Sequence, residues 1–473
     1  MAETLNRTRI DFLAERSKSS KMLGRSPKIE RWRAPKEWIM ALRKSLFSRS
    51  VELAKLGVKL AAKEIQSGDF QSRIDQARLL TQSLSQLKGA AMKAGQLISL
   101  EMADYFPPEA AEILGQLQNN ATAANFETIR QTLLEELGEE RLREFTFIDP
   151  TPKASASIAQ IHKAHWRQQE VALKVQHLGV AESIDSDLAI LQNLAGTFCK
   201  LTQRSMNLEP LFDELKDVLK QEVDFSKEAT LLKTYRRQLI TLTSEYGNYF
   251  SPTVVEELTT NKVITMSWEE GETLLPWLKT NPSSEQRQGL AHLVLNLYCH
   301  EFFDWGLVQT DPNFSNFLIR SPDQKDADHV GLVILDFGST RHYERAMIHE
   351  YVDLLKAVEG GSPRVILQNA FQFGLLDPRE SGETKQLFVD MMNLAIEPFN
   401  EEIFDFTSTD YSRRSQTVIK EFVRSLKYSP PPHRILFLHR KLGGIFSLLK
   451  RLEVKLNIKP YWELMVNKKG DLL

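Results

Sequence analysis

The spacing of apolar residues changes along this chain, and each change predicts a different kind of secondary structure. Residues 37–140 carry apolar side chains at helical spacing, and a Pro-Pro pair at 107–108 separates off a further helix over 109–118. Residues 145–270 predict strands with one or two helices, and the last of these strands covers 263–266. The chain therefore changes from helical to strand-rich structure near residue 145.

Helical spacing returns from residue 285, apart from strands on either side of Asp336. A helix over 344–358 begins almost directly after those strands. Three prolines at 430–432 precede a last amphipathic helix, 434–452. Strands and helices thus occupy separate stretches, which predicts an α+β fold. For 473 residues, a two-lobed domain with a helical extension fits better than one compact unit.

Composition excludes several classes of protein. The sequence shows no internal repeat, no low-complexity tract and no secretory signal. The only two cysteines, Cys199 and Cys299, cannot build a disulfide framework, which favours a reducing compartment. The histidines show no metal-ligand spacing, and we expect His292 and His300 to pack within or cap helices. The best apolar run, 292–303, is too short and interrupted to span a bilayer, so we predict no membrane-spanning helix.

Charge is distributed unevenly along the chain. The net charge is −2, yet residues 1–50 hold 13 Lys or Arg against 5 Asp or Glu, a net +8. Four apolar residues of this segment recur at helical spacing: Trp38, Ile39, Leu42 and Leu46. A basic amphipathic helix of this kind can lie in an anionic lipid surface. It can equally pack on the rest of the protein with its charges in solvent, and the sequence leaves both interpretations open.

Two strings near residue 311 indicate a metal–nucleotide site. Val-Gln-Thr-Asp-Pro-Asn-Phe-Ser-Asn-Phe, residues 308–317, places Asp311 five residues before Asn316. About twenty residues on, Asp336 opens an Asp-Phe-Gly turn directly after an apolar strand. In protein kinases an Asp of this loop faces the nucleophile, while the Asn and the Asp-Phe-Gly Asp hold Mg²⁺. An Asp that ends a strand is often only a turn residue, but the two strings together favour the metal site.

A strand upstream supplies the cation that such a site needs. The string Glu-Val-Ala-Leu-Lys-Val-Gln, residues 170–176, places Lys174 where kinases have the Lys of a Val-Ala-Ile-Lys motif. Kinases also cover the phosphates with a glycine-rich turn, because glycine lets the backbone approach closely. Here the corresponding stretch, 153–162, contains no glycine and is rich in alanine and serine instead.

At this point the chain resembles a known family, the UbiB-type atypical kinases (AarF domain), and most closely their coenzyme Q kinase-like members. Four motifs carry the resemblance, in the family's order, between about residues 85 and 345. They are the K-x-G-Q motif with Lys93 and Gln96, the alanine-rich loop Ala154, Ser155, Ala156 and Ser157, the E-x-D motif with Glu222 and Asp224, and the Gln-Thr-Asp-Pro-Asn loop followed by Asp-Phe-Gly.

The resemblance implies an atypical protein-kinase-like, two-lobed fold with an N-terminal helical extension over the active site. It implies four regions: a basic helical region (1–80), the extension with the K-x-G-Q motif (81–144), an N-lobe (145–270) and a helical C-lobe (271–473). The extension would place Lys93 against the acidic pair Glu222 and Asp224. A small-residue helix around Lys93 is otherwise read as close helix packing. Burying Lys93 without a partner would cost free energy, so we expect the loss of either Lys93 or its acidic partners to be strongly destabilising.

Several departures from the motifs of ordinary protein kinases argue against a peptide substrate. Gln309 and Thr310 stand where those enzymes have His-Arg, and Asn313 stands where they have a Lys beside the transferring phosphate. The helix predicted at 344–358 follows the Asp-Phe-Gly turn at once, and no Ala-Pro-Glu string follows. Little room remains for an activation segment, so we expect no surface for docking a peptide.

We therefore expect an ATP-binding, Mg²⁺-dependent atypical kinase or ATPase that supports ubiquinone biosynthesis. The alternative is a nucleotide-binding pseudokinase scaffold that organises lipid-modifying enzymes. Asp311 would orient the nucleophile, Asn316 and Asp336 would hold metal, and Lys174 would contact the α- and β-phosphates. The expected partner of Lys174 is Glu228, with Glu222 as the alternative.

The expected partners beyond ATP are an anionic lipid surface and ubiquinone-biosynthesis proteins, without nucleic acid. The expected location is cytoplasmic, peripheral on the inner membrane. A mitochondrial presequence is disfavoured because Glu3, Asp11 and Glu15 are acidic residues that such peptides avoid.

Overall fold

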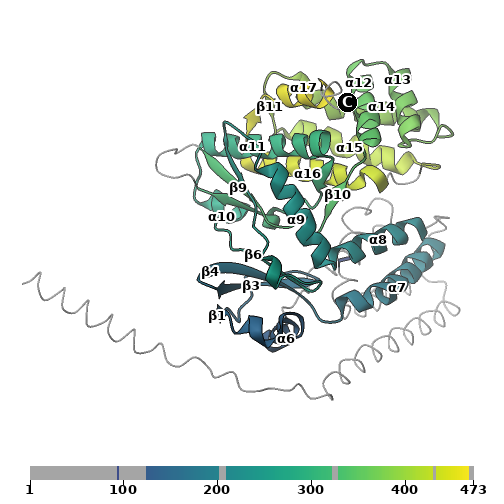
Figure 1. Ribbon diagram of the computed structural model, residues 1–473. Helices are drawn as coiled ribbons and strands as arrows, with labels where there is room; N and C mark the ends of the chain where they lie inside the picture. Colours follow the sequence, from purple (N-terminus) through teal and green to yellow (C-terminus); the bar gives the residue numbers. More distant parts are fainter. Residues whose placement is uncertain (1–92, 95–123, 202–208, 322–328, 430–432, 468–473) are drawn as a thin grey trace, which may run out of the picture. The chain divides into compact units, whose positions relative to one another are not determined.

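The computed structural model describes residues 93–94, 124–201, 209–321, 329–429 and 433–467, all within the chain's second unit, 67–473 (Figure 1). The predicted helices before residue 92, the helix at 109–118 and Gln96 therefore lie outside the described residues.

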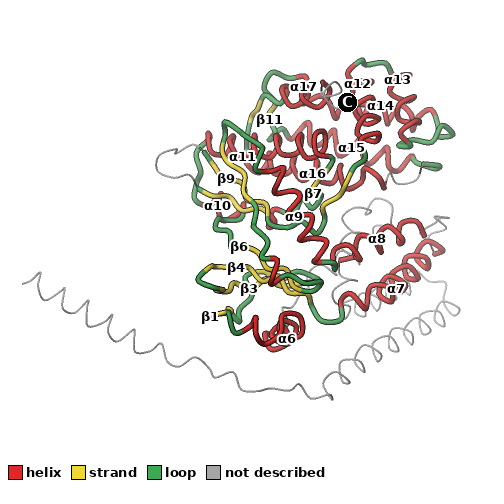
Figure 2. Tube along the Cα trace, viewed as in Figure 1, coloured by secondary structure: helices red, strands yellow, loops and turns green. Residues whose placement is uncertain are grey.

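The N-terminal lobe is built on an antiparallel sheet in the order β1-β3-β4-β6, whose strands are labelled in Figures 1 and 2. The short strand β2 pairs with β3. Its strands are β1 (Phe145–Ile148), β2 (Ala154–Ser155), β3 (Ala159–Trp166), β4 (Gln169–Gln176) and β6 (Val263–Ser267). The β3–β4 hairpin closes through Arg167 and Gln168, both at positive φ. Two such residues make the tight hairpin turn whose twist matches the flanking strands. The strands predicted at 170–176 and 263–266 are thus confirmed.

Alternation along β4 assigns its side chains to two different layers. Val171, Leu173 and Val175 belong to a buried cluster with α6 (Phe126–Leu142). Because side chains alternate between the faces of a strand, Ala172 and Lys174 point to the opposite face. Ala172 accordingly belongs to the other core cluster, which includes residues of α9.

Three helices lie between β4 and β5: α7 (Val180–Leu201), α8 (Glu209–Glu222) and α9 (Phe225–Leu239). The sequence predicted only one or two helices in the whole lobe, and this is a correction. The additional pair is α7 and α8, which pack on each other as an insertion before α9. Because α7 and α8 bury their apolar faces against each other, they do not need to pack on the sheet.

The C-terminal lobe begins with α10 (Leu274–Lys279), α11 (Ser284–Cys299) and its π-helical continuation η4 (His300–Trp305). Short strands follow: β7 (Leu307–Gln309) pairs with β10 (Thr340–His342), and β8 (Phe317–Arg320) and β9 (Val330–Ile334) form a hairpin beside β5 (Gly247–Phe250). The 3₁₀ turn η5 (Phe314–Asn316) lies between β7 and β8, and another 3₁₀ turn, η3 (Glu256–Leu258), packs on β6 in the N-terminal lobe. The strands predicted on either side of Asp336 are therefore present.

The rest of the lobe is helical, as predicted. The helices are α12 (Arg345–Glu359), α13 (Pro363–Phe373), α14 (Gly382–Asn400), α15 (Thr409–Ser425), α16 (His433–Leu452) and α17 (Lys459–Asn467), with a small β11 (Phe404–Asp405) and β12 (Lys455–Leu456) ladder. The helices predicted at 344–358 and 434–452 match α12 and α16. The sequence analysis missed α17, which follows α16 through the β12 strand.

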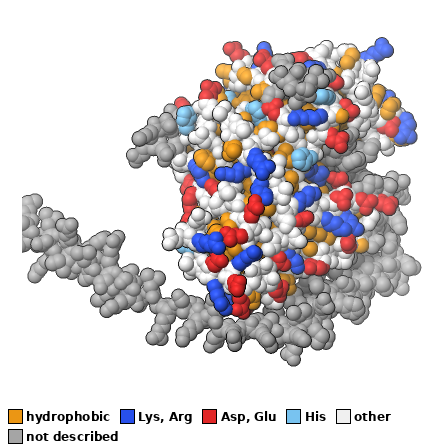
Figure 3. Space-filling view, viewed as in Figure 1, with side chains coloured by type: hydrophobic (Ala, Val, Ile, Leu, Met, Phe, Trp, Pro, Cys, Tyr) orange, Lys and Arg blue, Asp and Glu red, His pale blue; other side chains and the backbone are white. Residues whose placement is uncertain are grey.

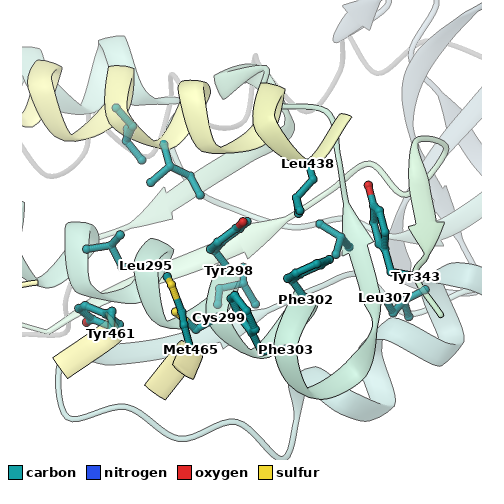
Figure 4. Close-up of a cluster of buried hydrophobic side chains, with 14 of the residues drawn as sticks. Leu295, Tyr298, Cys299, Phe302, Phe303, Leu307, Tyr343, Leu438, Tyr461 and Met465 are labelled. Atoms are coloured by element: carbon teal, nitrogen blue, oxygen red, sulfur yellow. The ribbon is translucent and has the colours of Figure 1, made fainter. Parts of the chain in front are cut away.

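An aromatic core joins α11 and η4 to the last two helices (Figure 4). Phe302 packs edge-on against Phe303 and Tyr343, with ring centroids 4.9 and 5.3 Å apart. Leu438 of α16 points into the same cluster, and Tyr461 and Met465 of α17 line its other end. This core fixes α16 against the segment that leads into β7.

His292 and His300, the two histidines expected to pack within or cap helices, contact neighbouring side chains. His292 stacks on Tyr246 with ring centroids 4.0 Å apart and lies 2.8 Å from the Tyr461 hydroxyl. His300 pairs with Asp304 one turn later, and Cys299 is buried. Within the described ranges no cluster of three His, Cys, Asp or Glu side chains suits a metal ion, and no helix is long and apolar enough to cross a membrane.

Candidate active site

Lys174 is directed towards α9 by the register of β4. Its Nζ lies 2.7 and 2.9 Å from the two carboxylate oxygens of Glu228, and 3.1 Å from Oδ1 of Asp336. The aromatic ring of Phe225, the first residue of α9, lies 5.3 Å below the same ammonium group. The structure thus pairs Lys174 with Glu228 rather than with Glu222, and it adds Asp336 as a second partner.

Lys174, Glu228 and Asp336 shift one another's pKa values. Glu228 is only 3% exposed, and burial raises its pKa to about 7 against the opposing charge of Lys174. Burial would lower the pKa of Lys174, but the charges of Asp336 and Glu228 outweigh it and raise that pKa. Burial would likewise raise the pKa of Asp336, yet Lys174 and the Gly338 N–H hold it well below its usual range. Two carboxylates therefore share one cation, and Asp336 keeps its charge more readily than Glu228.

The loop that runs from β7 into η5, the candidate catalytic loop, places Asp311 beside Asn316. The Asn316 side-chain N–H donates to Oδ2 of Asp311 at 2.9 Å, and Nη2 of Arg440 lies 3.4 Å from Oδ1. Asp311 itself is 7% exposed. Asn313 is exposed and caps η5 by accepting the Ser315 N–H, so it supplies no charge to the loop. The cation beside Asp311 comes from α16 instead.

Backbone contacts bring Asn316 next to the Asp-Phe-Gly turn. The Leu335 N–H donates to the carbonyl of Asn316 at 3.0 Å, and the Gly338 N–H donates to Oδ1 of Asp336 at 3.1 Å. The Asn316 amide nitrogen is engaged by Asp311, which turns its amide oxygen away; no described hydrogen bond involves that oxygen. The Asp336 side chain is 34% exposed. An amide oxygen and an accessible carboxylate are donors that suit Mg²⁺.

The entry to this loop depends on Gly306. Its φ is +60°, and a Cβ there would lie 2.7 Å from the Tyr343 carbonyl oxygen. Gly306 follows η4 directly and ends it in a left-handed conformation. The glycine thereby lets the chain reverse from η4 into β7, which carries the loop.

Lys93 reaches the site through Glu222. Its Nζ lies 3.2 Å from Oε1 of Glu222 at the end of α8. Burial alone would lower the pKa of Lys93, but the carboxylates of Glu222 and of the two site aspartates outweigh it and raise the pKa. The same Glu222 oxygen accepts the Ser339 hydroxyl at 2.9 Å, and the Ser339 carbonyl accepts the Thr310 hydroxyl at 2.6 Å. A chain of contacts thus joins Lys93 to the residue before Asp311.

Asp224 has a different place from the one expected. It is exposed and caps α9, accepting the Lys227 N–H at 2.9 Å. Only Glu222 of the E-x-D pair forms an ion pair with Lys93 among the described contacts. Asp224 thus caps the helix that carries Glu228.

The alanine-rich loop lies on the same face of the sheet as Lys174. Ala154 is the register partner of Ile161, and Ile161 is the register partner of Lys174. Two strand spacings separate Ala154 from Lys174, about 10 Å. Ala154, Ser155 and Ala156 are exposed and Ser157 is half-buried; the Ala156 N–H closes the turn on the Ala159 carbonyl at 2.8 Å. The loop therefore borders the space in front of Lys174.

The sequence analysis missed four residues that contact the site: Glu301, Ser339, Arg440 and Lys441. Ser339 adjoins the Asp-Phe-Gly turn and could have been considered for that reason. Arg440 and Lys441 lie 129 and 140 residues from their partners in the chain, within an ordinary amphipathic helix. No local pattern marks them.

Comparison with known proteins places this arrangement in a class. The ABC1 atypical kinase-like domain matches residues 116–368. The atypical kinase COQ8, mitochondrial, of Saccharomyces cerevisiae is 31% identical over 377 residues, which cover 79% of this chain and 72% of that protein. The rat atypical kinase COQ8B, mitochondrial, is 30% identical over 403 residues, which cover 82% of this chain and 71% of its own.

A solved structure agrees with the sequence relatives. The complex of Rv3197 with erythromycin from Mycobacterium tuberculosis aligns with a TM-score of 0.54 and 25% identity, covering 84% of this chain and 97% of that one. The chain is a kinase-like protein of mixed helix and strand. It belongs to the ABC1 atypical kinase-like (UbiB) family, so the predicted family and α+β fold class are confirmed.

Proposed function

We propose that this protein is a Mg²⁺-dependent, ATP-binding atypical kinase or ATPase that supports ubiquinone biosynthesis. The observation that carries the proposal is the position of Lys174, which lies within 3.1 Å of both Glu228 and Asp336. A cation held between a helix carboxylate and the Asp-Phe-Gly carboxylate is the arrangement with which kinases bind metal–ATP. The pathway assignment rests on the COQ8 relatives.

Each site residue then has a role derived from its contacts. Lys174 contacts the α- and β-phosphates, and Glu228 holds it in place. Asn316 and Asp336 hold Mg²⁺, which when bound neutralises charge on the phosphates. Ala154, Ser155, Ala156 and Ser157 cover the phosphates with small side chains.

Asp311 orients the nucleophile and accepts its proton. Arg440, 3.4 Å from its carboxylate, supplies positive charge where a protein kinase has a Lys two residues after this Asp. Lys93 and Gln96 act from the helical extension, Glu222 at the end of α8 pairs with Lys93, and Asp224 acts by capping the helix that carries Glu228. Lys93 lies near the carboxylates of Glu222, Asp311 and Asp336, and its positive charge offsets the repulsion between them and a bound phosphate.

Purified protein tests the catalytic half of the proposal. We expect Asp311→Asn to lower the kcat of phosphate release from Mg²⁺-ATP about 10²- to 10⁴-fold, the usual contribution of a positioned general base. Asp410→Asn, an exposed change at the start of α15, serves as the matched control and should retain activity. Equal phosphate release by wild type and Asp311→Asn would instead favour the pseudokinase scaffold.

Thermal shift tests the binding half. Mg²⁺-ATP should stabilise the wild type by about 3 kcal/mol at a hundredfold excess over Kd. Lys174→Ala and Asp336→Asn should each lose most of this shift, because a phosphate cation and a metal carboxylate are removed. An undiminished shift in both variants contradicts the assignment of the site.

A further inference from the structure

Glu301 is the centre of a buried polar network beside the catalytic loop. The residue lies in η4 and is 0% exposed. Its Oε1 accepts the Tyr235 hydroxyl at 2.7 Å and the Gln309 backbone N–H at 3.0 Å. Its Oε2 pairs with Nζ of Lys441, which is 5% exposed. A carboxylate so far from water must be matched by such partners.

Two of these contacts lead to the residues of the site. Gln309 ends β7, two residues before Asp311. Tyr235 belongs to α9, the helix that carries Glu228, and its ring packs edge-on against Phe337 with centroids 4.9 Å apart. Phe337 directly follows Asp336. One carboxylate is therefore bonded to the catalytic strand and, through Tyr235, to the Lys174 partner helix and the Asp-Phe-Gly turn.

The remaining contact leads to α16, which lies against the catalytic loop at a second point. A Cβ on Gly444 would lie 2.2 Å from Cβ of Pro312, so only glycine permits the Pro312 ring to pack this closely on α16. Leu438 of the same helix points into the core beside Phe302 (Figure 4). This helix, His433–Leu452, lies beyond residues 116–368, where the family domain matches.

The buried Glu301–Lys441 ion pair is not explained by its contribution to stability alone. Replacing a buried ion pair with neutral groups of similar volume is often neutral or stabilising. A charged acceptor has another effect, because hydrogen bonds to a carboxylate are shorter and about twice as strong as neutral ones. Both donors to Glu301 belong to elements whose placement the site requires.

We propose that Glu301, paired with Lys441, is a positioning residue that holds the catalytic strand and α9 in register for phosphoryl transfer. This inference rests on the proposed ATP-dependent function. In this proposal α16 has two roles: Arg440 places a positive charge beside Asp311, and Lys441 supports the catalytic loop through Glu301.

The test is the double variant Glu301→Gln with Lys441→Met. The Gln carbonyl oxygen can accept from both Tyr235 and Gln309, and Met fills the Lys stem without a charge. We expect a melting temperature close to or above that of the wild type, and a KM for ATP within about twofold. We expect kcat to fall roughly tenfold, since one weakened charge-assisted hydrogen bond is of that size. Deuterium exchange should quicken in peptides covering 307–313.

A matched control separates positioning from the general effect of removing an ion pair. Arg414 and Glu397 join α15 to α14, and neither helix contacts Asp311 or Asp336 among the described interactions. Glu397→Gln with Arg414→Met should leave both kcat and exchange at 307–313 unchanged. A folded Glu301/Lys441 double variant with wild-type kcat and exchange would overturn the inference, since the pair would then be merely structural.

Two further results keep the inference testable. If the double variant fails to fold, Tyr235→Phe removes one donor while keeping the ring on Phe337; it should lower kcat several-fold at unchanged KM, and wild-type kcat would overturn the inference. If the wild type shows no ATP turnover, the proposed function fails. The exchange comparison still decides the inference in that case, because it requires no activity.

Discussion

At the scale of single residues, Glu228 makes the site sensitive to pH. Its pKa is raised from 4.5 to about 7, chiefly by burial. Between these values the folded protein binds a proton that the unfolded chain releases, so this group lowers the free energy of unfolding as pH rises from 4.5 to 7. The ionised form that holds Lys174 thus predominates only above about pH 7.

We therefore predict that ATP turnover falls as the pH is lowered through about 7, with the slope of a single ionisation. Protonated Glu228 no longer offsets the charge of Lys174, and the ammonium group loses one of its two partners. The measurement is the pH profile of kcat/KM at saturating Mg²⁺. Glu228→Gln cannot titrate here, so its lower activity should be flat across this window. An identical slope in that variant would assign the ionisation to another group.

At the scale of elements, the segment after the Asp-Phe-Gly turn is very short. β10 (Thr340–His342) pairs with β7, and α12 starts at Arg345 with Glu344 as its N-cap. The backbone of this segment is tied down further, because the Gln221 side chain donates to the Thr340 carbonyl at 2.9 Å and the Tyr343 N–H donates to the Gly306 carbonyl at 2.8 Å. This segment therefore leaves no extended loop on which a peptide could bind.

This predicts that generic protein substrates are not phosphorylated. Casein incubated with the purified protein and radiolabelled Mg²⁺-ATP should incorporate no more label than with Asp311→Asn. A conventional protein kinase in the same buffer provides the positive control. Strong labelling of casein by the wild type alone would show that a peptide surface exists outside the β10–α12 segment.

The elements that could be predicted are those whose signal is local. The strand at 170–176 and the helix at 344–358 were recognised because their periodicity is complete within each segment, and they match β4 and α12. The α7–α8 insertion was undercounted, because its helices bury their apolar faces against each other within a lobe expected to be mostly strands. A two-residue strand, β12, separates α16 from α17 and is too short to show a period.

The same distinction holds within the site. Asp311, Asn316 and Asp336 lie in two neighbouring loops, so their spacing could be read directly. Lys174 and Glu228 are 54 residues apart; the motif around Lys174 favours a glutamate partner, but the sequence left Glu222 open as the alternative to Glu228. Glu301 could not be found, because its role depends on Tyr235 and Lys441, 66 and 140 residues away. Only the folded arrangement shows that these residues meet.

At the scale of the whole molecule, positive charge is distributed unevenly along the chain. Lys and Arg side chains are interspersed with Asp and Glu over the described part of the face shown in Figure 3. The excess of positive charge is concentrated instead in residues 1–50, net +8, which lie outside the described residues. We expected a cytoplasmic location from the sequence, whereas the yeast and rat relatives are named as mitochondrial. Attachment to lipid can be measured independently of compartment.

We predict that residues 1–50 help dock the protein reversibly on anionic membranes. The +8 excess attracts acidic headgroups over about 8–10 Å at physiological salt. Four apolar residues at helical spacing add burial in the interface: Trp38, Ile39, Leu42 and Leu46. Full-length protein should co-sediment with phosphatidylserine vesicles and be released by added salt, and a chain starting near residue 51 should bind much less. Vesicles of phosphatidylcholine alone are the control. Equal binding by the two chains, or binding indifferent to salt and acidic lipid, would mean that this segment packs on the protein with its charges in solvent.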